Sequence, residues 1–544
     1  MAPNAKRITF WQLLFDQGAV TQEVIDHAYP GSGTVDDPFI VSWIPNDPRN
    51  PLLMPESLKW VITVLVSLAT FDASLVSSGY SGSLNEIVEY FHISEEVSYL
   101  GISLFVLGFA IGPIFWAPLS EIYGRRWIYI LSCASLAIFT AGVAGAKNTA
   151  TLLVLRALAG SLGSAPMAIP GGVVADVFPP IPRGLAGGVY AAAPFVGPTL
   201  GPIISGFIAE SGGWRWVQGF LALFSGVLTV LVVFLFPETY APVLLRRRAS
   251  RLSKTTGMVY RSAADTQTAR KTITTAMSRP WMLLFREPIV LLLSLYSAIV
   301  YGILYMFLAA FPIVFQEVRG WNEGLGGLSF LGILLGTVIA VAYTYPTYFR
   351  YKKKSLALTS GRLPPEERLP DSFPAAIALP IGLFWFAWTN SPSIHWLVPI
   401  AAGVPFGFGM VMVFLPIFNY LIDAYTIYAA SVMAANSMLR SVFGAAFPLF
   451  TGYMFQNLGI HWASSVPAFL SLACAPLPFV FWVYGPWVRT HSKYAAEAEE
   501  YMQRVMGGQQ GGDRQGGQDE GTQSEGGQGL EDEEKRVSSS TGNE

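Results

Sequence analysis

The sequence predicts an all-α membrane protein with 12 transmembrane helices in two pseudo-symmetric six-helix bundles and both chain ends in the cytosol. Twelve apolar stretches fill residues 58–486, and each is long enough to cross a bilayer, which takes about 20 apolar residues. The composition agrees, because 52% of the residues are hydrophobic and only 13% are charged. Soluble domains carry about 25% charged residues. The placement of basic residues sets the orientation.

The predicted helices divide into two sets of six. They cover residues 58–80, 97–119, 127–146, 150–178, 184–208, 214–236, 288–313, 325–349, 373–390, 395–421, 429–455 and 464–486. The domain boundaries that follow are a cytosolic N-terminal segment at 1–57, an N-terminal bundle at 58–236, a basic cytosolic linker at 237–287, a C-terminal bundle at 288–486 and a cytosolic tail at 487–544. From about residue 505 the tail holds almost nothing apolar, so we expect disorder there.

The basic residues favour one orientation of these helices. With a cytosolic N-terminus, the loops from residue 120 onward place 19 Lys and Arg residues on the cytosolic side and three outside. Cytosolic loops of membrane proteins carry such an excess of basic residues. Both termini are therefore expected in the cytosol.

Several functional classes lack their sequence signatures. The net charge of −2 provides no basic surface for nucleic acid. Cys133 and Cys474 both lie in predicted helices, the five histidines are scattered, and no phosphate-binding GxxxxGK[ST] sequence occurs. We therefore expect no enzyme activity, no metal, no cofactor and no nucleic-acid partner.

Four short motifs carry a family resemblance. The sequence APLSEIYGRR follows the second helix and includes Glu121, Gly124, Arg125 and Arg126. The fifth helix contains Pro194, Gly197, Pro198, Gly201, Pro202 and Gly206. FPETYAPVLL spans 236–245, and LRSVFGAAFP spans 439–448. Together these motifs resemble the major facilitator superfamily, and within it the fungal twelve-span drug:proton antiporters that export polyamines and drugs.

The resemblance implies roles for the first two motifs. It implies that the loop motif latches the two halves on the cytosolic side, with Asp176 and Arg183 as a second gating element; a plain basic membrane anchor is the alternative. For the fifth helix it implies a pliable element between the halves. Its prolines each remove a backbone hydrogen bond, and its glycines allow close helix approach. A simple packing face is the alternative there.

Three charged residues are predicted deep in the membrane, where a charge costs on the order of 2.5–3.5 kcal/mol and needs a cavity or a partner. Asp72 is the candidate proton carrier, unless it is permanently paired. Arg156 matches an arginine of the family's fourth helix and is a candidate sensor of proton or substrate, unless it only binds backbone carbonyls. Arg440 is expected near the cytosolic mouth, with its guanidinium reaching water.

In the implied fold the substrate lies near the midplane between the halves. The candidate pocket residues are Tyr301, Tyr305, Phe406, Met410 and Asn436. Aromatic and Met side chains suit a large apolar ligand, although the same residues could face lipid or pack in a core.

These observations predict a proton-coupled secondary transporter that exports small hydrophobic or cationic compounds by alternating access. The cargo would be a drug, a toxin, a polyamine or a self-made secondary metabolite. Its partners would be protons, this small molecule and the lipid bilayer, and it would act as a monomer in the plasma membrane, or alternatively the vacuolar membrane. Proton-symport uptake of a nutrient and a non-transporting, receptor-like relative are the two other readings of the sequence.

Overall fold

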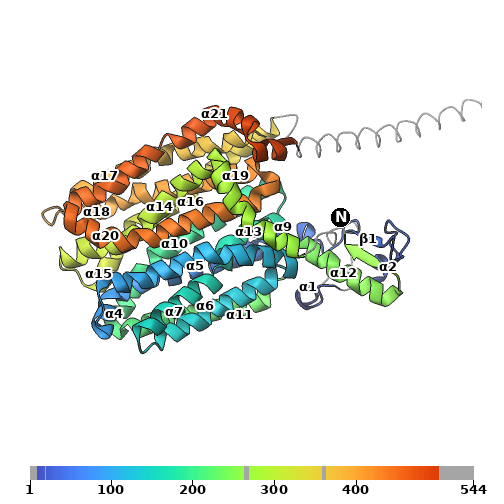
Figure 1. Cartoon of the computed structure of the whole chain (residues 1–544), viewed down its shortest axis with the longest axis horizontal. Coiled ribbons are helices and arrows are strands. Elements are labelled where there is room, and N and C mark those ends of the chain that lie inside the picture. The colour runs from blue at the N-terminus through green and yellow to red at the C-terminus, as the bar shows by residue number, and fades with distance from the viewer. Residues whose placement is uncertain (1–8, 19, 263–268, 358–362, 501–544) are drawn as a thin grey trace, which may run out of the picture.

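The structure, a computed structural model, describes residues 9–18, 20–262, 269–357 and 363–500, and these are mostly helical (Figure 1). The expected disorder from about residue 505 falls outside the described residues. Ten helical segments among the described residues are long and apolar enough to span a membrane. An all-α membrane architecture is thereby confirmed.

The N-terminal bundle contains the first predicted six helices. Its elements are α3 (Glu56–Gly79), α4 (Leu84–Phe91), α5 (Glu95–Tyr123), α6 (Arg125–Ala144), α7 (Thr149–Leu162), α8 (Ala165–Ala168), α9 (Pro170–Val177), α10 (Pro180–Gly212) and α11 (Trp214–Leu235). The fourth helix is not continuous as expected over 150–178, but is divided into α7, α8 and α9. Pro166 and Pro170 lack the N–H that a continuous helix requires; Pro166 lies in the first turn of α8, and Pro170 begins α9.

The C-terminal bundle repeats this arrangement. Its elements are α14 (Pro288–Phe311), α15 (Glu323–Gly327), α16 (Leu331–Leu356), α17 (Phe373–Thr389), α18 (Leu397–Ala401), α19 (Gly403–Ala424), α20 (Ala429–Cys474) and α21 (Leu477–His491). Gly459 interrupts the long α20 with φ of 70° and ψ of 164°. Glycine adopts this backbone conformation readily because it has no Cβ. The interruption falls between the eleventh and twelfth predicted helices.

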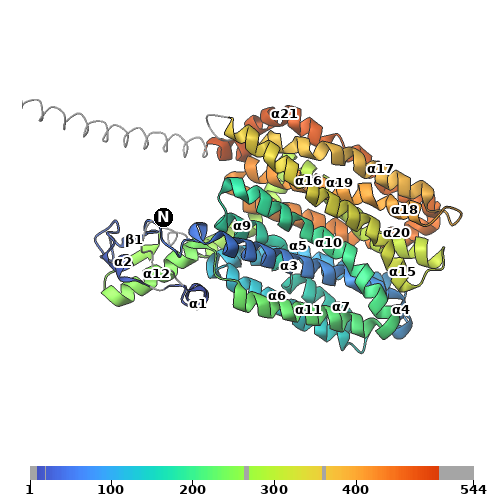
Figure 2. The same cartoon turned by 180° about the vertical axis from the view of Figure 1, so that it is seen from behind.

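The two bundles lie side by side and meet along an interface that we call the seam (Figures 1 and 2). At the seam, α5 packs against α20, and α10 packs against α15 and α16. The approach of α10 is close, because a side chain at Gly206 would overlap the carbonyl oxygen of Glu323. The first and last described segments lie at the same end of the bundles.

A small lobe projects from that end of the bundles (Figure 1). It is built from α1 (Phe10–Phe15), α2 (Gln22–Asp26), β1 (Phe39–Val41), α12 (Ala241–Thr256) and β2 (Tyr260–Ser262), with β1 and β2 paired in parallel. Its apolar core joins Val24 and Val41 to Leu252, so the N-terminal segment and the linker fold together. The linker then continues as α13 (Ala269–Arg286), which contacts α5 and α20.

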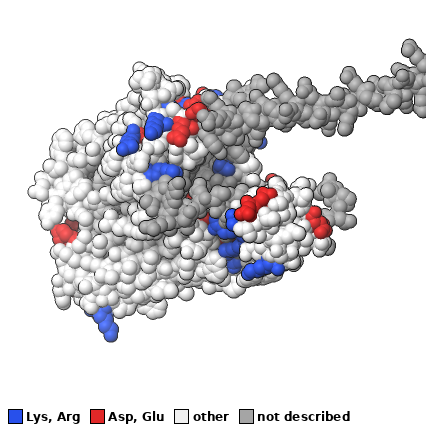
Figure 3. Space-filling model, turned by 45° about the vertical axis from the view of Figure 1, so that its right-hand side comes forward, with Lys and Arg blue, Asp and Glu red and all other residues white. Residues whose placement is uncertain are grey.

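Charged side chains gather on the lobe and the adjoining end of the bundles, whereas the visible bundle surface is largely uncharged (Figure 3). Inside the lobe, Arg248 Nη1 lies 2.6 Å from Asp47 Oδ2, and both side chains are almost fully buried. On the lobe surface, Arg251 pairs with Asp16, and both of these side chains are exposed.

These two ion pairs supply a matched test of how the lobe is held together. Asp47→Ala leaves Arg248 buried without its partner, which costs about 3–5 kcal/mol. Asp16→Ala removes an exposed pair worth about 0–1 kcal/mol. Hydrogen exchange of the α12 amides in the full-length protein should accelerate strongly in the first variant and little in the second. Equal protection in both variants would contradict this account of the lobe.

Candidate functional site

The loop motif forms a sharp turn between α5 and α6. Helix α5 ends at Tyr123, Gly124 adopts φ of +99°, and α6 begins at Arg125. L-amino acids with side chains rarely occupy such a conformation. A Cβ at Gly124 would also overlap the carboxylate of Glu238. Two independent constraints therefore favour glycine at this position.

A network of charged groups surrounds this turn. Arg125 Nε donates to Asp176 Oδ2 over 3.2 Å, and its guanidinium lies 4.6 Å from the ring centre of Tyr240. The carboxylate of Glu238 accepts from the backbone N–H groups of Arg125 and Arg126, at 2.8 and 3.4 Å. Burial raises the pKa of Glu238 above its ordinary value, and the donated backbone hydrogen bonds oppose that shift.

This network, Arg125–Asp176–Glu238, links the α5–α6 turn to α9 and to the start of the linker. Glu238 was not among the expected site residues, although the sequence FPETY directly after the sixth helix could have drawn attention to it. Arg126 adds a connection to the lobe, since its guanidinium donates to the carbonyl of Leu14 and lies 5.3 Å from the ring of Phe15.

The other residues expected at this gate lie nearby with different partners. Glu121 precedes Arg125 by four residues, but α5 ends between them and Arg125 pairs with Asp176. Arg183 donates to the carbonyl oxygens of Ala175 and Phe178, both at 3.3 Å, and so caps the end of α9.

The C-terminal bundle carries a similar pair in the corresponding place. Arg368 Nε, in the loop before α17, donates to Asp423 Oδ2 near the end of α19 over 2.9 Å. Its guanidinium also lies 3.6 Å from the ring centre of Tyr351. Each half thus joins an arginine and an aspartate from two segments that lie far apart in the sequence of that half.

The Gly/Pro motif lies along α10, which runs unbroken despite Pro194, Pro198 and Pro202. Side chains at Gly197 and Gly201 would overlap α3 within the same half. Only Gly206 among the three motif glycines meets the opposite half, at α15. The motif therefore serves packing inside the N-terminal bundle as well as closure of the seam.

Arg156 is fully buried, and backbone carbonyl groups bind its guanidinium. It donates to Gly101 O at 3.0 Å and to Val76 O and Ser77 O, both at 2.9 Å. The last two carbonyls lie in the final turn of α3, where intrahelical partners run out. Arg156 therefore fixes the end of α3 against α5.

Asp72 lies on another face of α3 and is fully buried. Its Oδ1 accepts from the hydroxyl of Ser225 on α11 over 2.8 Å, while Oδ2 has no hydrogen-bond partner among the described residues. The structure does not bring Asp72 and Arg156 together, since the contacts of Arg156 are to carbonyls nearer the end of α3.

Aromatic side chains fill the centre of the seam. Tyr305 shares a 2.6 Å hydrogen bond with Ser77 of the opposite half and accepts one from Tyr301 over 3.3 Å. The ring of Phe195 on α10 contacts Tyr301 and Phe414. Two of the five pocket candidates, Tyr301 and Tyr305, therefore lie at the seam.

The other three candidates lie within the C-terminal bundle. The ring of Phe406 packs against Phe307, and Met410 is fully buried in the hydrophobic core. Asn436 donates to Ser294 Oγ over 3.2 Å. Arg440 does not reach water at the cytosolic mouth as expected, because it is 97% buried, against the rings of Tyr301 and Phe414.

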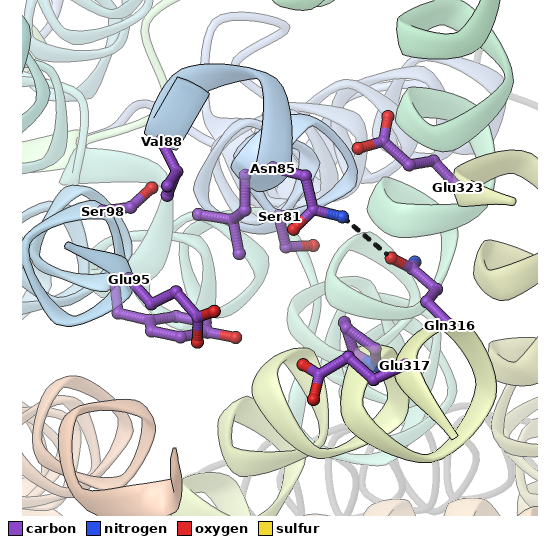
Figure 4. Close-up of a pocket in the computed structure, with 11 residues that line it drawn as sticks. Ser81, Asn85, Val88, Glu95, Ser98, Gln316, Glu317 and Glu323 are labelled. Atoms are coloured by element: carbon purple, nitrogen blue, oxygen red, sulfur yellow. Dashed lines mark hydrogen bonds between the residues drawn. The ribbon is translucent and has the colours of Figure 1, made fainter. Parts of the chain in front are cut away.

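At the end of the seam away from the lobe, polar contacts join the two halves, and Figure 4 shows one of them, between Asn85 and Gln316. Asn85 Nδ2 donates to Gln316 Oε1 over 3.3 Å, and Asn322 Nδ2 donates to Glu210 Oε1 over 2.8 Å. A shallow acidic pocket lies beside these contacts, with a volume of about 430 Å³ and with Glu317 and Glu323 in its wall.

Comparison with known proteins places the chain in a family. The model of the Major Facilitator Superfamily matches residues 66–448. The chain belongs to the major facilitator superfamily. Among solved structures of this superfamily, the proton:xylose symporter XylE covers 79% of this chain and 96% of its own, with a TM-score of 0.58 at 16% identity. That likeness shows the fold.

Curated members of the superfamily are much closer in sequence. The MFS-type efflux pump MFS2 of Trichophyton rubrum is 58% identical over 92% of this chain and 84% of its own. The multidrug transporter mdrA of Aspergillus fumigatus is 56% identical over 92% of this chain and 83% of its own. Efflux pump FUBT of Fusarium oxysporum is 48% identical over 89% of this chain and 82% of its own. The resemblance to fungal drug exporters of the superfamily is thus confirmed.

Gly124→Ala tests the turn in this member of the superfamily. The added methyl group meets the Glu238 carboxylate, and the positive φ adds strain on the order of 1–2 kcal/mol. We expect a lower melting temperature and a slower transport turnover, with cargo selectivity unchanged. Gly226→Ala is the control, because a Cβ there meets no atom within 4 Å. Wild-type turnover in Gly124→Ala would remove the turn from the transport cycle.

Proposed function

We propose that this protein exports small, largely hydrophobic compounds across a membrane in exchange for protons, by alternating access between its two bundles. The observation that carries the proposal is the combination of a two-bundle transporter fold with sequence identities of 48–58% to fungal efflux pumps and a multidrug transporter. Buried polar groups at the seam and in α3 supply the means of coupling.

The proposal extends to topology and assembly. We propose 12 crossings, with α7–α9 counted as the fourth and α20 divided at Gly459 into the eleventh and the start of the twelfth. The lobe, both chain ends and the basic linker then lie in the cytosol, which agrees with the basic loops. We further propose the five-part domain division given above, a monomer and the plasma membrane.

In this proposal Asp72 carries the proton. It is the buried acidic side chain of α3, and one of its oxygens has no hydrogen-bond partner among the described residues. Arg156 holds the end of the same helix, α3. A movement of α3 that follows protonation of Asp72 therefore reaches the seam at the hydrogen bond between Ser77 and Tyr305.

Uptake of a nutrient by proton symport is the competing direction of transport. Everted vesicles decide between the two: accumulation of rhodamine 6G driven by an inside-acid gradient supports export. No accumulation in these vesicles, together with uptake by whole cells, would favour import. No gradient-driven movement in either direction would favour a receptor-like protein.

Asp72→Asn should abolish proton-driven export and leave protein levels in the membrane unchanged, because the amide keeps the size of the side chain but cannot carry the proton. Ser225→Ala is the matched control, since it removes the hydrogen-bond partner and keeps the acid. We expect this control to export still, with a change in the pH at which export is half-maximal. Normal drug resistance in cells that express Asp72→Asn would exclude Asp72 as the carrier.

A further inference from the structure

Arg440 differs from the other buried arginines of the bundles. Its side chain lies within α20, 11 residues after the helix begins at Ala429 and thus about 16 Å along the helix axis, which is near the middle of a bilayer. Its Nε and Nη1 have no acceptor among the described residues, and none of the ion pairs formed there includes it. Arg125 and Arg156, by contrast, bind a carboxylate and three carbonyls.

The surroundings of Arg440 are aromatic, and they lie where the two halves meet. Its guanidinium lies 4.7 Å from the ring centre of Tyr301 and 4.8 Å from that of Phe414. Phe195 of the N-terminal bundle contacts both of these rings. Cation–π contacts hold an arginine in place but leave the N–H groups in its plane free to donate.

The helix face that carries Arg440 is polar. Ser437 lies one turn before Arg440, and Ser441 follows it directly. Both serines are buried and have hydroxyl oxygens without partners among the described residues. Gly444 continues this face and lies against the ring of Tyr301 and the side chain of Val106 of the opposite half. The unpaired donors therefore lie along the seam.

An unpaired buried cation is expensive, so its retention at the seam points to a partner that arrives during the transport cycle. The planar guanidinium matches a carboxylate with two parallel hydrogen bonds. Rings on either side suit a flat apolar body. We propose that Arg440, with Tyr301 and Phe414, binds the cargo, and that this cargo is a small aromatic or planar compound bearing a carboxylate.

This inference rests on the proposed export function and narrows its substrate class. The sequence predicts hydrophobic or cationic cargo, whereas the charge of Arg440, which has no ion-pair partner among the described residues, is positive and selects for an anion. Opening of the seam in alternating access gives such a molecule a path to Arg440, because it removes Phe195 of the N-terminal half from the two rings that contact the guanidinium.

The test measures binding of tritiated 2-naphthoate to the purified full-length protein in lipid nanodiscs. Neutral 2-naphthamide, which has the same shape, and 2-naphthylmethylamine, which is cationic, serve as competitors. We expect naphthoate to bind at least about tenfold more tightly than the amide, the discrimination that one charge-assisted hydrogen bond supplies. Equal affinities for the acid and the amide would overturn the proposal.

Variants separate a direct role of Arg440 from a structural one. Arg440→Gln should lose the preference for the acid and retain the amide affinity, and Arg440→Lys should keep part of the preference. Arg319→Gln is the control, since Arg319 binds the carbonyls of Ile394 and Ser391 outside the seam centre. If Arg440→Gln does not fold, the wild-type ratio of acid to amide affinity is the deciding measurement.

Two further measurements determine which kind of anion binds and separate the class of cargo from the export function. If chloride or acetate at the same concentrations displaces naphthoate as well as unlabelled naphthoate does, the site binds small inorganic or aliphatic anions and the aromatic cargo is excluded. One outcome is that everted vesicles with an acidic interior accumulate rhodamine 6G, but the binding assay shows no preference for the acid over the amide. This outcome would keep the export function and reject the proposed class of cargo. A naphthoate preference in binding, with no gradient-driven accumulation of either rhodamine 6G or naphthoate in the vesicles, would reject the export function instead.

Discussion

A charge inside a bilayer-spanning bundle must be neutralised or hydrogen-bonded there, because water is scarce and an isolated ion is costly. The buried charges of this chain satisfy that constraint in different ways. Arg125 has a carboxylate partner, Arg156 has three backbone carbonyls, and Asp72 has one serine hydroxyl. The more complete the set of partners, the more firmly the residue is tied to structure. Buried charges with incomplete sets of partners are the ones whose energy a bound proton or ligand can lower.

Helix α3 connects most of these charges. One face presents Asp72 to α11, the last turn offers the carbonyls of Val76 and Ser77 to Arg156, and the Ser77 hydroxyl reaches Tyr305 across the seam. A change in the charge of Asp72 therefore acts on the same rigid helix that contacts the opposite half. The distance to be bridged along the helix is five residues, or about 7.5 Å. Coupling between Asp72 and the seam therefore needs only helix α3.

The sequence predicts the helices well because apolar length is a local property. The positions of Gly124, Arg125 and Asp176 also follow from local motifs. The pairing of Arg125 with Asp176 and Glu238 does not, since these groups are brought together only by packing of distant segments. The prediction that Arg440 lies near the cytosolic mouth is wrong for the same reason. Spacing along the chain does not reveal that rings from α14 and α19 contact it. The lobe was likewise invisible, because its strands lie more than 200 positions apart.

The placement of strong and weak contacts suits a pair of bundles that must separate and rejoin. The charged network around Arg125 lies within the N-terminal half and the linker, so it keeps that half rigid and does not tie it to the other. The contacts across the seam are of a different kind. Beside the packing of α5 on α20 and of α10 on α15 and α16, they include the Asn85–Gln316, Asn322–Glu210 and Ser77–Tyr305 hydrogen bonds and the ring contacts of Phe195. A single hydrogen bond of this sort is worth about 0.5–1.5 kcal/mol, which thermal motion and a bound ligand can offset. Rigid halves joined by individually weak contacts are suited to open as units, and in the proposed cycle such opening removes Phe195 from the two rings that contact Arg440.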